Sequence, residues 1–218
     1  MELRFIYFDI PFWRAEMSRL ALHIGGVPFQ DVRPSREEFQ EMKSSGALPY
    51  GQLPVLEVDG VMVAQSLAIA RFCGRSSGLY PENPLDAARV DEILDTANQI
   101  MADLAPGMRE KDPETRASVR EHLGTVVLPK WFGLLEQRLL ANGDTGYFVG
   151  EQITVADLAI WRLVGWLTGG ILDGIPTTLL EPHPALQRQF DTVDQRDDVR
   201  AWMTKCYGKS QGSARRLQ

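Results

Sequence analysis

The stretch of residues 51–66 constrains the fold of this chain more than any other. Two short apolar runs rich in β-branched side chains, residues 55–58 and 61–64, flank Asp59-Gly60, a pair that suits a tight type I′ turn. This pattern predicts a β-hairpin. Leu53-Pro54 comes directly before it. Because an X–Pro bond adopts the cis form at modest cost, we expect the backbone of Leu53 to turn outward and to pair with an extended peptide.

A helix start follows the hairpin. Gln65-Ser66 precedes apolar residues at helical spacing, so we predict Ser66 as the N-cap of a helix. The N-terminus of a helix carries unpaired N–H groups and a positive dipole end, and both favour the binding of a carboxylate. Each of these features is usually structural when it occurs alone. In this order they predict a site for a small peptide-like anion.

The residues before the hairpin predict the rest of a small α/β domain. Residues 3–8 are nearly all apolar or aromatic, which is typical of a strand covered on both faces. Met17, Leu20, Ala21 and Ile24 then recur at helical spacing, and we expect a second strand near residues 29–32. The resulting order is βαβ followed by ββα, which is the thioredoxin-like order.

Strand patterns stop after the proline-rich connection of residues 80–84, and helical spacing continues to the end of the chain. Asp112-Pro113 predicts the start of a long helix that reaches residue 140, is kinked by Pro129 and ends at Asn142-Gly143. Thr154 and Asp157 have the spacing of a capping box. We predict a first domain of residues 1–79, a linker of residues 80–86, an all-helical domain of residues 87–208 and a flexible tail of residues 209–218.

Composition excludes several classes of protein. A formal net charge of −6 disfavours non-specific binding of nucleic acid. No apolar run approaches the roughly 20 residues that span a bilayer, and the N-terminus lacks a signal peptide, so we expect a cytoplasmic protein. Cys73 and Cys206 are too few and too far apart for a disulfide framework or a thiolate metal site. Gly46 and Gly51 have P-loop spacing, but Gln52-Leu53 replaces the required Lys-Ser/Thr.

The Leu-Pro turn, hairpin, Gln-Ser pair and helix, in that order, resemble the glutathione-binding half of the glutathione transferase family. The capping box and the final amphipathic pattern through Phe190 and Trp202 resemble its second domain, so the resemblance covers almost the whole chain. It is nearest to the tyrosine-type sigma branch, which includes prostaglandin D synthases, with a pi-like feature at residues 48–52. The resemblance implies a thioredoxin-like α/β N-terminal domain followed by an all-α helical domain.

The resemblance also implies a catalytic role for Tyr7, whose hydroxyl would donate a hydrogen bond to the glutathione sulfur. A free thiol has a pKa near 8.5, and lowering it by roughly 2 units requires about 3 kcal/mol. One charge-assisted hydrogen bond contributes roughly 1.5 to 3 kcal/mol. Arg14 corresponds to the arginine that supports the thiolate, although the loop of residues 9–13 is one residue longer than the family pattern. Without the resemblance, Tyr7 reads as a core residue and Arg14 as a surface arginine.

Several more positions match glutathione-binding residues of the family. Lys43 is implied to meet the glycine carboxylate, and Phe39 replaces a tryptophan often found beside it. Asn98 or Gln99 occupies the place of an acidic residue that many members present to the glutathione of the other subunit. The full set that the resemblance implies for glutathione binding is Tyr7, Phe8, Arg14, Phe39, Lys43, Gln52, Leu53, Pro54, Gln65 and Ser66.

The same comparison implies a second site and a dimer. The residues expected to line a site for apolar electrophiles are Phe12, Trp13, Met101, Leu104 and Met108. The three on the helix are read equally well as core. Tyr50 matches the aromatic key that some branches insert between helices of the partner subunit, so the resemblance implies a homodimer.

The function implied is detoxifying transfer, in which bound glutathione thiolate attacks the electrophilic carbon of a small hydrophobic molecule without a metal or redox cofactor. Two alternatives remain open. A glutathione-dependent isomerase or peroxidase of the prostaglandin D synthase type shares the first step and differs in the apolar pocket. The second alternative is a non-catalytic ligand-binding or structural member, like the lens crystallins built on this fold. The altered loop and Phe39 keep this alternative open, whereas Tyr7 and Gln65-Ser66 argue against it.

Overall fold

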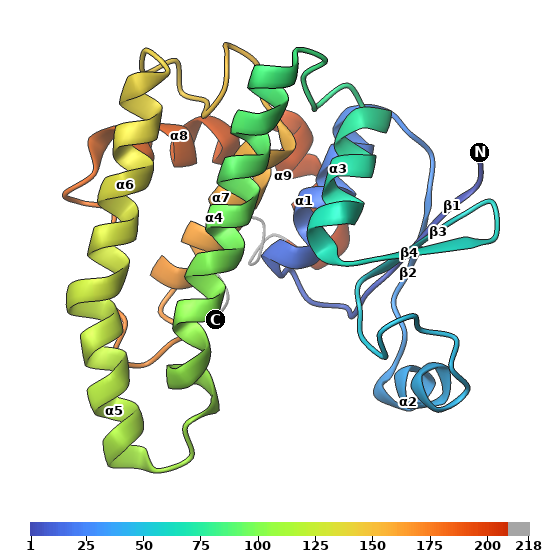
Figure 1. Ribbon diagram of the computed structural model, residues 1–218, viewed down its shortest axis with the longest axis horizontal. Helices are drawn as coiled ribbons and strands as arrows, with labels where there is room; N and C mark the ends of the chain where they lie inside the picture. Colours follow the sequence, from blue (N-terminus) through green and yellow to red (C-terminus); the bar gives the residue numbers. More distant parts are fainter. Residues whose placement is uncertain (209–218) are drawn as a thin grey trace.

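The computed structural model describes residues 1–208, and it places a four-stranded sheet beside a group of long helices (Figure 1). The sheet has the order β2-β1-β3-β4. β1 (Leu3–Ile6) pairs parallel with β2 (Gln30–Val32) and antiparallel with β3 (Val55–Val58), which pairs antiparallel with β4 (Val61–Ala64). The predicted hairpin is confirmed. The tail predicted over residues 209–218 lies outside the described residues.

Side chains of β1 and β3 alternate between two hydrophobic cores, as expected for a sheet covered on both faces. Leu3, Phe5 and Leu56 join the large core with α1 (Trp13–Ile24) and α3 (Ser66–Ser76). Ile6 and Val55 join a small core on the opposite face. That face is covered by α2 (Arg36–Ser44), a helix that the sequence analysis did not predict (Figure 1).

The helical part begins with α4 (Pro84–Arg109), which starts inside the stretch expected to be a linker. The long helix expected from residue 113 to 140 is divided into α5 (Pro113–His122), a π-helical turn η1 (Leu123–Val127) and α6 (Leu128–Ala141). Pro129 is the second residue of α6 and has no N–H to bond to the preceding turn, which explains the change in helical hydrogen bonding there. The chain continues through α7 (Val155–Thr168), α8 (Pro184–Asp194) and α9 (Asp197–Tyr207).

Helix α7 is the centre of the structure. All 14 of its residues are buried, and it packs against α1, α4 and α8. The capping box predicted at Thr154 and Asp157 is confirmed at its N-terminus. Because α1 contacts both the sheet and α7, one continuous core joins the two parts of the chain. Within residues 1–208, no helix combines the length and the apolar character needed to cross a membrane. A thioredoxin-like domain followed by a helical domain is therefore confirmed.

Candidate active site

A cavity of about 310 Å³ opens where α1, the hairpin, α3 and α4 meet. Its volume lies at the lower end of the range typical of ligand pockets. Polar groups dominate the wall. The residues that line the cavity are Arg14, Tyr50, Gln52, Leu53, Pro54, Ala64, Gln65, Ser66 and Asn98. The structure thus brings together six of the residues named above for glutathione binding, from Arg14 to Ser66, and adds Tyr50, Ala64 and Asn98.

One wall of the cavity is formed by the segment before β3. The peptide bond between Leu53 and Pro54 is cis, and Pro54 is buried while Gln52 is exposed. Lys43 on α2 lies next to this segment: a Cβ placed on Gly51 would be 3.6 Å from its Cε. Phe39 of the same helix packs edge-on against Phe8, with ring centres 5.1 Å apart. Lys43, Phe39 and Phe8 therefore lie beyond the cavity wall, on the α2 side.

The opposite wall is the N-terminus of α3, where the prediction for Ser66 was wrong by one residue. Gln65 occupies the N-cap position, and Ser66 is the first helical residue. Gln65 has φ 72°, a left-handed conformation that is disfavoured for a residue with a Cβ and that often marks a functional site. Among the described residues, no side chain caps this helix end. Its first N–H groups are therefore available to an anionic ligand.

Arg14 connects three helices at the cavity. Its Nη1 donates to the Ser66 hydroxyl at 3.1 Å and to Oδ1 of Asn98 at 3.3 Å, and its guanidinium lies 4.7 Å from the centre of the Trp13 ring. Burial lowers the pKa of Arg14, and the nearby Tyr7 raises it. An arginine nevertheless stays protonated in a protein. The cavity therefore holds a fixed positive charge beside the N-terminus of α3, with the neutral amide of Asn98 next to it.

Tyr7 follows the last residue of β1, and its backbone N–H still pairs with the carbonyl of Val32 at 3.1 Å. Its side chain is 6% exposed and lies 5.5 Å from the Phe8 ring, centre to centre. Burial raises the pKa of Tyr7 to about 12, although the positive charges of Arg14 and Arg19 act in the opposite direction. The phenol is therefore neutral at physiological pH, so it can donate a hydrogen bond but cannot act as a base.

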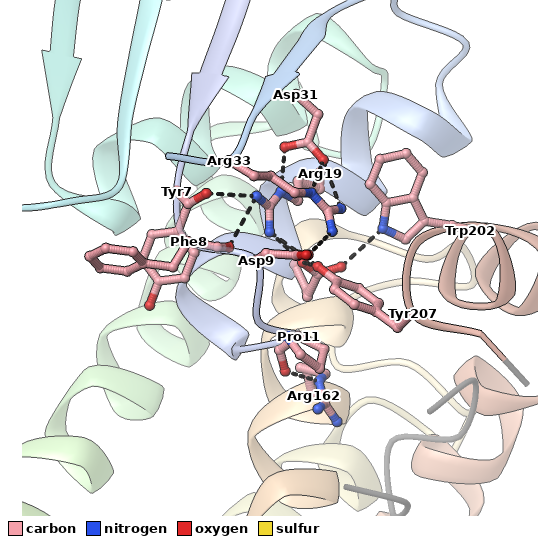
Figure 2. Close-up of polar contacts among 11 residues, drawn as sticks. Tyr7, Phe8, Asp9, Pro11, Arg19, Asp31, Arg33, Arg162, Trp202 and Tyr207 are labelled. Carbon is pink, nitrogen blue, oxygen red and sulfur yellow. Dashed lines mark hydrogen bonds and ion pairs between the residues drawn. The ribbon is translucent and has the colours of Figure 1, made fainter. Parts of the chain in front are cut away.

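Sequence reasoning missed a group of buried charges behind Tyr7 (Figure 2). Arg19 is fully buried and pairs with Oε1 of Glu16 at 2.9 Å and with Oδ1 of Asp31 at 2.8 Å. Its Nη2 donates to the backbone carbonyls of Tyr7 at 3.3 Å and of Phe8 at 3.5 Å. The Tyr7 hydroxyl points away from this group (Figure 2). The signal in the sequence was a Glu-x-x-Arg pair among the apolar residues of helix α1.

The longer loop of residues 9–13 is anchored to α7. Nε of the buried Arg162 donates to the carbonyl of Pro11 at 2.6 Å (Figure 2). Phe12 packs edge-on against Trp166, one turn further along the same helix, with ring centres 5.3 Å apart. Two contacts therefore fix this loop to one helix, a feature that the sequence analysis did not predict.

The five residues expected at an electrophile site do not share one environment. Trp13 has no exposed surface and belongs to the core, contrary to the prediction. Leu104 is only 1% exposed, which agrees with the core reading that the sequence left open for the residues on the helix. Met101 is nearly buried as well, whereas Phe12 is half-buried and Met108 is 44% exposed. Packing of α4 and α1 against α7 explains the difference, because the central helix covers these faces. None of the five lines the cavity described above.

Comparisons with known proteins agree with this arrangement. Residues 3–75 match the model of the glutathione S-transferase N-terminal domain, and residues 98–206 match a model of the C-terminal domain. A glutathione S-transferase of Ascaris suum is 34% identical, with 94% of this chain and 96% of that protein covered. Chicken hematopoietic prostaglandin D synthase is 32% identical, with 91% and 94% covered.

A solved structure has the same fold. The crystal structure of a monomeric glutathione S-transferase from the hookworm Necator americanus superimposes with a TM-score of 0.80 at 29% identity, with 94% of this chain and 97% of that chain covered. Both halves of the chain, and the order in which they occur, are thus those of known enzymes. The chain belongs to the glutathione S-transferase family.

Proposed function

We propose that this chain binds glutathione in the cavity between α1, the hairpin and α3, and that Tyr7 stabilises its thiolate for attack on small hydrophobic electrophiles. The observation that carries the proposal is the polar cavity at the N-terminus of α3, where Arg14 donates to the Ser66 hydroxyl. Tyr7 does not itself line this cavity, but it is a buried, neutral phenol whose pKa is influenced by the charge of Arg14. A neutral phenol is a hydrogen-bond donor, and a donor favours the charged form of an acceptor thiol. The thiolate, and not the thiol, is the nucleophile.

The binding roles follow from the chemistry of the wall. The carboxylate of the γ-glutamyl residue fits the N-terminus of α3, where Gln65, Ser66 and the Arg14 charge converge. The backbone beside the cis Leu53-Pro54 bond suits the peptide part of glutathione. We assign the glycine carboxylate to Lys43, which lies outside the cavity wall next to Gly51. These assignments rest on the match of each wall to one end of the tripeptide.

The reaction follows directly. The sulfur of the thiolate supplies an electron pair to the electrophilic carbon, a C–S bond forms, and the leaving group departs with the electrons of the bond that breaks. The thiol proton has already passed to solvent. The chain contributes the position of the sulfur and the stabilisation of its charge, and neither step requires a metal.

The test uses the purified protein with glutathione and 1-chloro-2,4-dinitrobenzene. We expect calorimetry to detect glutathione binding, ultraviolet absorbance to reveal thiolate in the complex at pH 7, and the aryl conjugate to form. Binding without thiolate or conjugate would favour a carrier, and absence of binding would overturn the proposal.

One alternative has a specific observation in its favour. The identity of 32% to a hematopoietic prostaglandin D synthase over 91% of the chain keeps a glutathione-dependent isomerisation open. An isomerase of this kind uses the same thiolate and returns glutathione unchanged, so the two functions differ in products. Product analysis with a cyclic endoperoxide separates them: net loss of glutathione identifies transfer, whereas rearranged product without loss identifies isomerisation.

Arg14 provides the sharpest test of the γ-glutamyl end. We expect Arg14→Leu to raise the KM for glutathione by about tenfold, because a charged hydrogen-bond donor to a carboxylate contributes roughly 1.5 kcal/mol. Arg75→Leu is the matched control, since it removes a cation from α3 that stacks on Tyr80 and does not line this cavity. Initial rates at varied glutathione give both KM values. Equal KM values in the two variants would contradict the assignment.

We also propose that the protein is a cytoplasmic homodimer. Cys73 and Cys206 are both unpaired, which suits a reducing compartment. Tyr50 is 67% exposed, so its ring is accessible to a second subunit. Sedimentation should give twice the chain mass of 24.4 kDa for the wild type and a shift toward the single chain for Tyr50→Ser. A wild type that sediments as a single chain would contradict the dimer.

A further inference from the structure

The last residue of α9, Tyr207, reaches the buried charges behind Tyr7 (Figure 2). Its hydroxyl donates to Oε1 of Glu16 at 2.6 Å and accepts from Nη1 of Arg19 at 3.2 Å. The Arg33 guanidinium lies 4.8 Å from the centre of its ring. Tyr207 is therefore held by three charged groups that come from α1 and from the chain after β2.

Glu16 is the residue through which α9 acts on α1. It is fully buried, and a buried carboxylate is destabilising unless its oxygens are paired. Oε1 binds Arg19 and Tyr207, and Oε2 accepts from the Trp202 indole at 2.9 Å. Two of these donors come from α9, so the C-terminal helix supplies much of the stabilisation of a charge on α1.

Arg19 connects Glu16 and Tyr207 to the backbone of Tyr7. The same guanidinium that contacts Glu16 and Tyr207 donates through Nη2 to the carbonyls of Tyr7 and Phe8. The Tyr207 hydroxyl is therefore joined through one arginine to the backbone of the residue that carries the catalytic phenol. We propose that Tyr207 is a positioning residue, which fixes Arg19 and through it the orientation of the Tyr7 hydroxyl toward the glutathione sulfur.

The charges around Tyr207 support a neutral phenol at this position. Glu16, Arg19 and Arg33 contact it, Asp31 pairs with both arginines, and Asp9 pairs with Arg33. Arg162 of α7 interacts electrostatically with both Glu16 and Tyr207. Burial raises the pKa of Tyr207, and the negative charge of Glu16 raises it further. The hydroxyl therefore keeps its proton and remains a donor to Glu16.

The test compares Tyr207→Phe with wild type by titrating the thiolate absorbance of the glutathione complex. Removing the Tyr207 hydroxyl takes away one hydrogen-bond partner of Arg19. Arg19 then fixes the backbone of Tyr7 less firmly, and the Tyr7 hydroxyl is less well oriented toward the glutathione sulfur. We expect the apparent pKa of bound glutathione to rise by about half a unit to one unit, and kcat/KM at pH 6.5 to fall about threefold to tenfold. The dissociation constant of glutathione should change less than twofold, because the γ-glutamyl site is untouched.

Tyr80→Phe is the matched control. The Tyr80 hydroxyl donates to Asp91 at 2.7 Å and its ring lies 4.8 Å from the Arg75 guanidinium, so the same kind of tyrosine is removed elsewhere. We expect a similar loss of thermal stability without a change in the thiol pKa. If Tyr207→Phe loses stability to the same extent and leaves the thiol pKa at the wild-type value, Tyr207 is only structural and the proposal is wrong.

A double variant tests whether Tyr207 acts through Tyr7. If Tyr207 acts through Tyr7, adding Tyr207→Phe to Tyr7→Phe should raise the thiol pKa no further. Additive shifts would overturn the proposal. Should Tyr207→Phe fail to fold, Trp202→Phe removes the other α9 donor to Glu16 and is expected to shift the thiol pKa in the same direction. The inference rests on the proposed function: a wild type that does not lower the thiol pKa refutes that function, whereas a normal wild type with an unshifted variant refutes only the inference.

Discussion

Replacing Tyr7 by phenylalanine is expected to lower kcat/KM for glutathione conjugation at pH 6.5 by about tenfold to a hundredfold. The hydroxyl is the donor that we assign to the thiolate, and a hydrogen bond to a charged group contributes roughly 1.5 to 3 kcal/mol. Phenylalanine keeps the ring, which packs against Phe8, so the fold should be preserved. Affinity for glutathione should stay close to the wild-type value, because the contacts at α3 and at the hairpin do not involve this hydroxyl.

The pH dependence of the same variant distinguishes a donor from a base. Burial raises the pKa of Tyr7 to about 12, so its protonation does not change between pH 5 and 10, and the profile reports the glutathione thiol. We expect the wild-type rate to rise with pH around an apparent pKa roughly 2 units below the free thiol value of about 8.5. In Tyr7→Phe this midpoint should move up by about 1 to 2 units.

The defect should therefore be largest at low pH and should shrink above pH 9 or so, where the thiol ionises without assistance. Tyr147→Phe is the control, because Tyr147 lies in the segment between α6 and α7 and does not line the cavity. A Tyr7→Phe defect that stays constant over this pH range would show that the hydroxyl does not act on thiol ionisation. Retained activity at every pH would remove Tyr7 from the mechanism.

The sequence was informative where structure is set by neighbouring residues. The hairpin and the capping box at Thr154 depend on two to four consecutive positions, and both predictions are confirmed. The Leu53-Pro54 bond is cis, a form that the sequence allowed. Six residues that line the cavity were named from the resemblance to the family, and their binding roles stay predictions. Ser66 was misplaced by one residue because a serine usually caps a helix, whereas here its hydroxyl accepts a hydrogen bond from Arg14, 52 positions away.

Features set by distant contacts were missed. Helix α2 contributes only Phe39 and Met42 to the small core, so its hydrophobic pattern is weak, although Ser35 and Glu38 form a capping box that marks its start. Trp13 was expected in a binding site, but packing of α1 against α7 buries it completely. The hydrogen bond between Tyr207 and Glu16 joins residues 191 positions apart, and no local pattern predicts such a contact.

The largest expected effect on stability is at Asp157. Its carboxylate is fully buried at the N-terminus of α7 and accepts from the Phe148 N–H at 2.9 Å, and from the N–H and hydroxyl of Thr154 at 2.7 and 2.8 Å. Alanine would leave all three donors buried without an acceptor. We expect Asp157→Ala to lower the free energy of unfolding by about 3 to 5 kcal/mol, a large part of the roughly 5 to 15 kcal/mol typical of a domain.

Urea denaturation at pH 8 measures this loss, because burial raises the pKa of Asp157 to about 6 and the carboxyl is ionised at that pH. Asp112→Ala is the control: Asp112 caps α5 and accepts from the Thr115 N–H at 2.8 Å, but it is exposed, so water can replace it. Equal losses in the two variants would contradict a special role for the buried carboxylate. Asp157→Asn keeps one acceptor oxygen, so its loss of unfolding free energy should lie between those of the two alanine variants.

Helix α7 also holds the loop before α1, through Arg162 and Trp166. Activity should therefore be lost where α7 unfolds, and it should fall in proportion to the folded fraction. The thiol pKa of the folded molecules should be unchanged.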